Sequence, residues 1–308
     1  MELLEKLIEV KGASGDESRI KEFVKNYVLQ NQDNWKVKPV IVDGEEWQDV
    51  MILVFGKPKT AIYAHLDSIG YTVGYSRELI KIGGPAAIDG MLLVGTDEFG
   101  KEIEVELNVF EDENGGAHYE YLGESDLQRG TQLTFKPNFR ETDDFVQTPY
   151  LDNRLGVWAS LQVAKTLENG AIVFSTYEEH GGNTVGYAAQ YLWENYKVRQ
   201  ALISDITWVT DGVQHKNGVA ISLRDSSVPR KTYIDRIVKL AKESGAKFQL
   251  EVEKSGGSDG SMLQKSSVMV DWCFIGAPED NVHTPDEKVA KEDIMNMVEL
   301  YKYLMSHL

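Results

Sequence analysis

The sequence predicts an α/β protein in which a mixed, mostly parallel sheet is sandwiched between helices and interrupted by a small all-β insertion. Strand-like and helix-like stretches alternate after residue 150, as they do when helices cover both faces of a sheet. The run Ala171–Tyr177 carries no charge, which is typical of a strand that is buried on both faces. Between about Gly70 and Pro149 helical periodicity is absent, and short strand-like stretches alternate with turn signals.

The first 69 residues are expected to form two helices and three strands. Leu3–Val10 has helical spacing of its apolar residues, and Ser14–Glu17 matches a capping box that would begin a helix running through Tyr27. The expected strands are Lys36–Val42, Val50–Phe55 and Thr60–Ala64. The last of these strands stops at His65.

Residues 70–149 are expected to form an inserted, barrel-like β domain. Turn signals such as Gly83-Gly84-Pro85 and Asn114-Gly115-Gly116 divide this segment into short strands. The expected strands are Leu79–Ile82, Met91–Val94, Ile103–Val109 and Gln132–Phe135. The flanking sequence, residues 1–69 plus 150–308, is then one domain.

Helices and strands are expected to alternate from Pro149 to the end of the chain. The expected helices are Arg154–Leu167, one capped by Asn183 or Thr184 and running through Trp193, Ile234–Ser244, Asp259–Gln264 capped by Ser258, and Lys291–Leu304. The expected strands are Ala171–Tyr177, Gln200–Ser204, Val219–Leu223, Lys247–Glu251 and Val268–Ile275.

Composition excludes several classes of protein. The net charge of -17, from 49 acidic and 32 basic residues, leaves no basic face of the kind that nucleic-acid-binding proteins show. The single cysteine, Cys273, cannot form an intrachain disulfide, and its apolar neighbours indicate a buried strand residue. The N-terminus resembles an amphipathic helix rather than a signal peptide, and no apolar run reaches the roughly 20 residues of a membrane span. We therefore expect a cytoplasmic protein with no nucleic-acid or membrane partner.

Side chains that can bind a metal stand near the ends of the predicted strands. His65, Asp152, Glu179, Asp205 and His283 each follow a strand or lie in a connecting loop. In open α/β sheets such loops converge outside the carboxyl ends of the strands. Carboxylates brought together there would repel one another, and two divalent cations would remove that penalty. Histidine and carboxylate ligands without cysteine indicate zinc first, with cobalt or manganese as alternatives, rather than a structural zinc.

Each motif has a simpler interpretation when taken alone. Asp152 precedes a helix and could be an N-cap. Asp205 and His283 could be ordinary polar loop residues, and so could His65 with the neighbouring Asp67. The joint occurrence of these residues near strand ends favours the metal site over the separate interpretations.

Two further carboxylates are expected to act beside the metals. Glu178 and Glu179 are adjacent after an uncharged strand, where they would repel each other unless each has a task. One could bind metal while the other accepts a proton from water. Asp67 lies two residues after His65 and could orient its imidazole by accepting the second ring N–H.

The order of these motifs resembles the dinuclear metallo-aminopeptidases of the tetrahedral type, a family that includes glutamyl and deblocking aminopeptidases. The strings that carry the resemblance are Ala64–Asp67, Leu151–Arg154, Glu178-Glu179 before two glycines, Ser204-Asp205 and Val282–Glu287. The resemblance extends over nearly the whole chain, including the β insertion. It implies two divalent metal ions, a peptide substrate that is hydrolysed at its N-terminus, and assembly into a dimer or a larger homo-oligomer.

The resemblance also implies a role for each residue. His65 would bind one ion and be oriented by Asp67. Asp152 would bridge both ions, and Asp205 and His283 would complete the two sets of ligands. Glu178 would be the general base and Glu179 a ligand beside it.

Three features depart from the family pattern. The β segment of about 80 residues is shorter than usual, Ser68 stands where an acidic residue often follows the Asp, and Glu179 is followed by His180-Gly181-Gly182 in an unusual spacing. A carboxypeptidase or deacylase on the same scaffold is a second possibility, with Arg154, Arg224 or Arg230 available to hold a substrate carboxylate. A non-catalytic, metal-binding assembly protein is a third.

Overall fold

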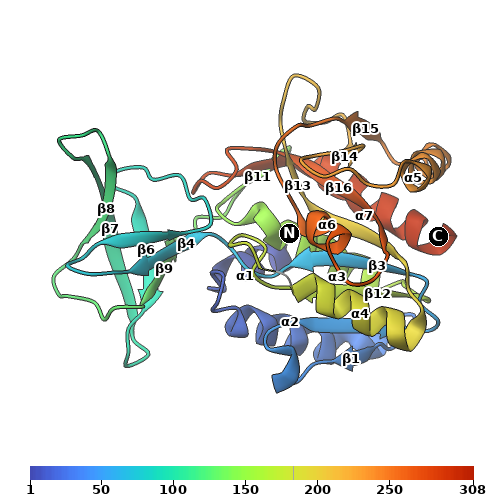
Figure 1. The fold of residues 1–308 in the computed structure, drawn as a ribbon, viewed down its shortest axis with the longest axis horizontal. Helices are drawn as coiled ribbons and strands as arrows, with labels where there is room; N and C mark the ends of the chain where they lie inside the picture. The colour runs from blue at the N-terminus through green and yellow to red at the C-terminus, as the bar shows by residue number, and fades with distance from the viewer. Residues whose placement is uncertain (183) are drawn as a thin grey trace.

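The structure is a computed structural model that describes residues 1–182 and 184–308. It confirms the predicted α/β class. Figure 1 shows a large sheet flanked by helices, with a separate group of strands projecting from one side. None of the helices in these two ranges combines the length and the apolar character that crossing a membrane requires.

The large sheet is mixed, with a parallel centre and antiparallel flanks. Its strands are β1 (Val40–Val42), β2 (Met51–Phe55), β3 (Thr60–His65), β10 (Arg140–Glu141), β11 (Phe145–Gln147), β12 (Gly170–Ser175), β13 (Gln200–Trp208), β14 (Val219–Ser222), β15 (Phe248–Glu251), β16 (Asp271–Asp280) and β17 (Lys288–Ala290). They are ordered β1-β2-β12-β3-β13-β16-β17-β11-β10, and β14 joins β16 to β15. The neighbours β12, β3, β13 and β16 are parallel, so their carboxyl ends lie at one edge.

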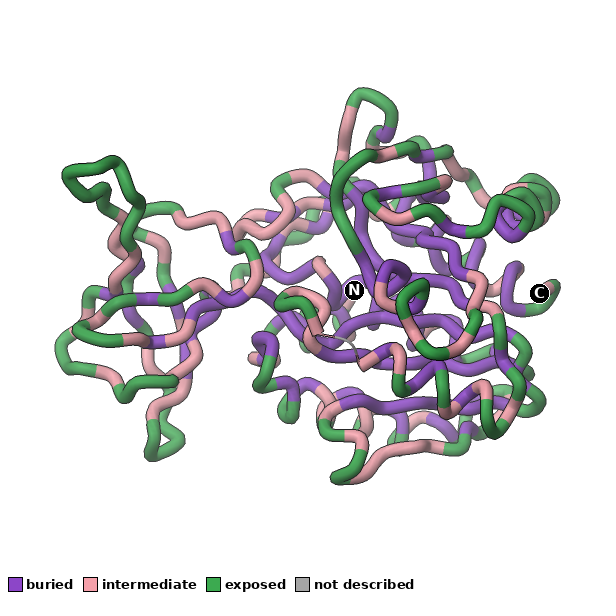
Figure 2. Tube along the Cα trace, in the orientation of Figure 1, coloured by how far each residue is buried: buried purple, intermediate pink, exposed green. Residues whose placement is uncertain are grey.

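Helices cover both faces of this sheet. They are α1 (Glu2–Glu9), α2 (Ser18–Asn31), α3 (Leu151–Ala164), α4 (Thr184–Tyr196), α5 (Lys231–Ser244), α6 (Asp259–Gln264) and α7 (Lys291–His307). Alternate residues of β2 point to opposite faces, as the strand period requires. Met51, Leu53 and Phe55 join an apolar cluster with α1, α3, α5 and α7, whereas Ile52 and Val54 join a second cluster with α4 and α6. The centre of the sheet is consequently buried on both sides (Figure 2).

The insertion is a small antiparallel, barrel-like domain. Its strands are β4 (Gly70–Val73), β5 (Leu79–Ile82), β6 (Leu92–Thr96), β7 (Glu102–Glu111), β8 (Ala117–Leu122) and β9 (Gln132–Phe135), in the order β5-β4-β9-β6-β7-β8. A bridge between Glu78 and Glu120 brings the two outer strands together. Residues 140–147 return to the large sheet, because β11 pairs with β17 and β10 with β11.

The predicted capping box at Ser14–Glu17 is wrong. Helix α2 begins at Ser18, and no side chain caps its first turn. Ser14 instead donates its hydroxyl to Asp67 over 2.5 Å, and the Glu17 carboxylate accepts from the backbone N–H of Tyr177 over 3.3 Å. The side chains of Ser14 and Glu17 therefore form hydrogen bonds to distant parts of the chain and do not cap the helix.

Several predicted boundaries also differ. Strand β13 continues to Trp208, so Asp205 lies within a strand rather than after one, because Ile206, Thr207 and Trp208 remain paired with β16. Only Val40–Val42 of the expected strand Lys36–Val42 is paired, and β4 and β8 were not predicted. The alternative cap at Asn183 lies outside the described residues.

Candidate metal centre

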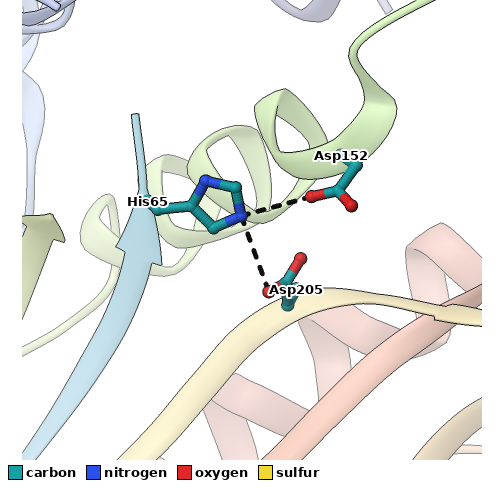
Figure 3. Close-up of side chains that lie close together, drawn as sticks. All are labelled: His65, Asp152 and Asp205. Carbon is teal, nitrogen blue, oxygen red and sulfur yellow. Dashed lines mark ion pairs between the residues drawn. The ribbon is translucent and has the colours of Figure 1, made fainter. Parts of the chain in front are cut away.

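One group of possible ligands lies where β3, α3 and β13 meet. His65 lies on β3 and Asp205 on β13, two strands that run parallel, and Asp152 lies at the start of α3. The Nε2 atom of His65 is 3.2 Å from Asp152 Oδ1 and 3.7 Å from Asp205 Oδ2 (Figure 3). These three side chains offer ligand atoms that all lie within 4.8 Å of one another.

A second group shares Asp152 with the first. His283 Nε2 is 3.4 Å from Asp152 Oδ2 and 3.1 Å from Glu179 Oε2. Its three potential ligand atoms also lie within 4.8 Å of one another. Asp152 thus turns one carboxylate oxygen toward each group, which is the arrangement that a ligand bridging two cations needs.

The local backbone explains how Asp152 reaches both groups. Helix α3 starts at Leu151, but Asp152 has non-helical backbone angles (φ -79°, ψ 104°). Asn153 is also non-helical, and its side-chain oxygen accepts the N–H of Gly156 over 2.9 Å, so Asn153 caps the regular helix and the N-cap interpretation of Asp152 is wrong. The carboxylate is directed to the two imidazoles instead.

Asp67 lies behind the first group and connects it to the glutamate pair. Its carboxylate accepts the backbone N–H groups of Glu178 (3.1 Å) and Glu179 (3.0 Å). Asp67 Oδ1 is 3.5 Å from Nδ1 of His65, and the Asp67 carbonyl oxygen is 3.2 Å from the same nitrogen. Asp67 is fully buried, so it fixes the backbone of both glutamates against His65.

Glu178 belongs to neither group of ligands. It follows β12, is half-buried, and lines a cavity of about 430 Å³ together with Asp152, Glu179, Asp205 and His283. Burial raises the pKa of its carboxyl well above the ordinary value, and the charges of Asp205 and Glu179 add to that effect. Glu178 therefore stands apart from both groups of ligands, with its carboxyl group on the wall of the same cavity.

The electrostatics of the cluster fit divalent cations. Burial, and then repulsion from Asp152, raises the pKa of Asp205 well above its ordinary value and that of Glu179 to about 7. Burial alone would lower the pKa of His283, but Asp152 and Glu179 outweigh it and raise this pKa to about 11. Raised pKa values of both the carboxyl groups and the imidazole mean that the cluster carries too little positive charge to balance its carboxylates. Divalent ions would supply that charge and take the place of the protons, because metal ligands must be deprotonated.

Unpaired buried atoms support the same conclusion. Among the described residues, Glu179 Oε1 is inaccessible to solvent and has no hydrogen-bond partner, and the buried His65 Nε2 and Asp152 Oδ1 have none beyond their 3.2 Å contact with each other. Buried polar atoms of this kind are normally satisfied. All three belong to the two groups of ligands, so a cation at each group would satisfy them.

Two neighbouring acids were not singled out from the sequence. Glu287 accepts the backbone N–H of Asp152 over 3.2 Å and that of His283 over 3.0 Å, so one carboxylate holds both loops. Glu279 is also buried, and neither of its carboxylate oxygens has a hydrogen-bond partner in the part of the chain that the structure describes. Glu287 ends the string Val282–Glu287, and an acid that closes a loop carrying a ligand was the signal available in the sequence.

The comparison with known families decides what kind of protein carries this cluster. The sequence pattern that defines the family described as M42 glutamyl aminopeptidase matches residues 114–300. The chain belongs to the M42 family. This family consists of metal-dependent hydrolases, so the protein is a metallo-aminopeptidase by family, as the motifs predicted.

Relatives of this M42 protein match it over almost their full length. A protein of Acetivibrio thermocellus named "putative aminopeptidase" is 26% identical over 330 aligned positions, covering 97% of this chain and 96% of that one. An aminopeptidase from the archaeon Desulfurococcus kamchatkensis has a TM-score of 0.83 at 19% identity, covering 100% of this chain and 94% of that one. The TET1 peptidase of Pyrococcus horikoshii has a TM-score of 0.80 at 20% identity, covering 98% of both chains. The two solved structures establish that the fold is shared.

Proposed function

We propose that this M42 protein is an aminopeptidase that removes N-terminal residues from peptides with two divalent metal ions and a glutamate general base. The observation that carries the proposal is the position of Asp152 between two His-carboxylate groups, with Glu178 beside them and outside both. His65 and Asp205 would hold one ion, Glu179 and His283 the other, and Asp152 both. Zinc is the ion we propose first, with cobalt or manganese as alternatives.

The chain's own residues would carry the proton transfers. Two such ions, when bound, polarise the scissile carbonyl and make water acidic enough to react near neutral pH. Glu178 would accept a proton from the attacking water and return it to the nitrogen of the leaving amine as the C–N bond breaks. Its half-buried place on the cavity wall supports this role.

Asp67 is proposed as the residue that positions this machinery. Because it accepts the N–H groups of both Glu178 and Glu179 and contacts His65, it would keep the base in a fixed position relative to the ligands. Positioning of this kind is needed for efficient proton transfer, since a base acts only within hydrogen-bond reach.

The composition of the cavity favours an aminopeptidase over a carboxypeptidase or deacylase. Within the described ranges no lysine or arginine lines it. Arg154, one of the cations considered for this role, is buried and donates to the carbonyl oxygens of Leu66 and Val10. Arg230 forms an ion pair with Asp271 instead, and the exposed Arg224 donates to the carbonyl oxygen of Asp225 over 3.1 Å without lining the cavity. A wall of carboxylates suits the ammonium group of a free peptide N-terminus and repels a substrate carboxylate.

A panel of substrates tests the reaction class and the metal requirement together. Hydrolysis of aminoacyl anilides should disappear after dialysis against a chelator and return when zinc, cobalt or manganese is added. N-acylated versions of the same substrates should remain intact. Full activity after the metal content has fallen to zero, or preferential cleavage of the acylated substrates, would refute the proposal.

We propose that the protein is a homo-oligomer, with the inserted β domain contributing to the contacts. The Pyrococcus horikoshii relative is described as assembling into a tetrahedron or a large octahedral shell. Exposed apolar side chains on the insertion, including Tyr75 and Phe99, support the same idea. Light scattering should give a mass that is a multiple of the 34.6 kDa chain, and a monomer at micromolar concentration would contradict it.

A further inference from the structure

The cavity extends beyond the metal centre to a second wall made of β13, β14 and β15. Thr207, two residues after Asp205 on β13, has its hydroxyl hydrogen-bonded to the carboxylate of Glu251 on β15. Two residues along a strand span about 6.6 Å and point to the same face. The wall therefore begins about one extended side chain away from the ligand Asp205.

Three carboxylates line this wall. Glu251 is only 3% exposed, Asp225 is 8% exposed, and Glu253 is half-buried. Burial raises the pKa of Glu251 and of Asp225 above their ordinary values, although the charge of Arg224 partly offsets this effect at Asp225. An ionised carboxylate in such a place is costly without a cation, and no lysine or arginine among the described residues lines the cavity.

Other side chains on the same wall suit an organic occupant. Ser222 pairs in register with Glu251 and lines the cavity, so its hydroxyl adds a polar group beside that carboxylate. Ile206, Trp208 and Phe274 contribute apolar surface between the metal centre and the acids. A chain of methylene groups that ends in a cation would match both parts of this surface.

We propose that this wall selects peptides whose first residue has a cationic side chain, lysine or arginine. The inference rests on the proposed function, because it places the first side chain of the substrate in the same cavity. The four-carbon stem of lysine would lie along the apolar surface, and its ammonium group would meet Glu251 and Glu253. An N-terminal glutamate, which the family description suggests as a substrate, would meet like charges there.

The acids on this wall are placed for an organic cation rather than for a third metal ion. Among the described residues, groups whose ligand atoms all lie within 4.8 Å of one another occur only at the two sites that share Asp152. Glu251, Asp225 and Glu253 belong to neither of them. They therefore do not form a group tight enough for a compact ion, whereas a flexible side chain with several hydrogen-bond donors does not need one.

Kinetics of the metal-loaded enzyme on Lys-, Arg-, Leu- and Glu-anilides test the proposal. We expect kcat/KM for Lys and Arg to exceed that for Glu by a factor on the order of 100 or more, because opposed like charges strongly disfavour binding. Glu253→Lys should lower the Lys-to-Glu ratio at least about tenfold, and the milder Glu253→Gln should lower it less. Glu243→Lys makes the same change of charge on the exposed surface of α5 and should leave the ratio as in the wild type.

The outcomes separate the preference from the activity. A wild-type enzyme that cleaves Glu- or Leu-anilide fastest would overturn the cationic preference while leaving the aminopeptidase intact. A ratio that is the same in Glu253→Lys and Glu243→Lys would also overturn it. Failure to cleave any of the four anilides would overturn the proposed function, and the preference with it.

Discussion

Glu178→Gln is expected to retain two metal ions per chain and to lose turnover. Glutamine keeps the shape of the side chain but cannot accept a proton from water, and Glu178 belongs to neither group of ligands. Loss of a general base typically lowers the rate by about 10² to 10⁴-fold, and we expect a reduction of kcat in that range. Metal analysis and steady-state kinetics on the same preparation measure both quantities.

Glu243→Gln is a matched control for this variant. It makes the same chemical change at an exposed position on α5 and should behave as the wild type in both measurements. A Glu178→Gln enzyme with wild-type kcat would show that another group accepts the proton. A variant that had lost one ion would show that Glu178 is a ligand.

Asp152→Asn is expected to lose metal from both groups and to lose activity with it. Asp152 places one oxygen 3.2 Å from His65 Nε2 and the other 3.4 Å from His283 Nε2, so it is shared by both groups. Asparagine removes the negative charge that would lie between two cations. Mutation of a residue that only supports a metal ligand typically lowers metal affinity by about 10- to 100-fold. We expect the loss of a ligand shared by both ions to lower the affinity more than that. Titration of the chelated protein with zinc measures the affinity and the number of ions bound.

Asp205→Asn provides the contrast within the site. Asp205 belongs to only the first group, so this variant should keep one tightly bound ion. Asp235→Asn, in an exposed pair with Lys231, controls for the loss of a surface carboxylate and should bind two ions. Equal stoichiometry in Asp152→Asn and Asp205→Asn would refute a shared role for Asp152.

Much of the large sheet could be predicted because each of its central strands contains a short, uncharged and mostly apolar run in the sequence. Uncharged runs such as β12 have the composition of strands buried on both faces, and the structure places them at the centre of the sheet. The position of His65 followed from the same pattern, since parallel strands bring their carboxyl ends to one edge, whereas Asp152 begins α3 after β11, which is antiparallel to β17. With that rule, the proximity of distant segments can be predicted before any of their contacts are known.

Other features depend on contacts that local sequence does not contain. Ser14 looked like a cap, but its hydroxyl is bonded to Asp67, 53 positions later. Glu287 holds Asp152 from 135 positions away, which no local pattern reveals. Asp205 was expected to follow the strand Gln200–Ser204, yet pairing with β16 extends β13 past it, although aspartate is disfavoured in strands. In each case a tertiary interaction outweighed the local preference.

Diffraction from zinc-grown crystals on both sides of the zinc absorption edge tests the central claim most directly. We predict two anomalous peaks per chain, one beside His65 and Asp205 and the other beside Glu179 and His283, with Asp152 between them. Glu178 should lie next to the peaks without contacting either. Peaks at other residues, or none beside these five side chains at saturating zinc, would contradict the account.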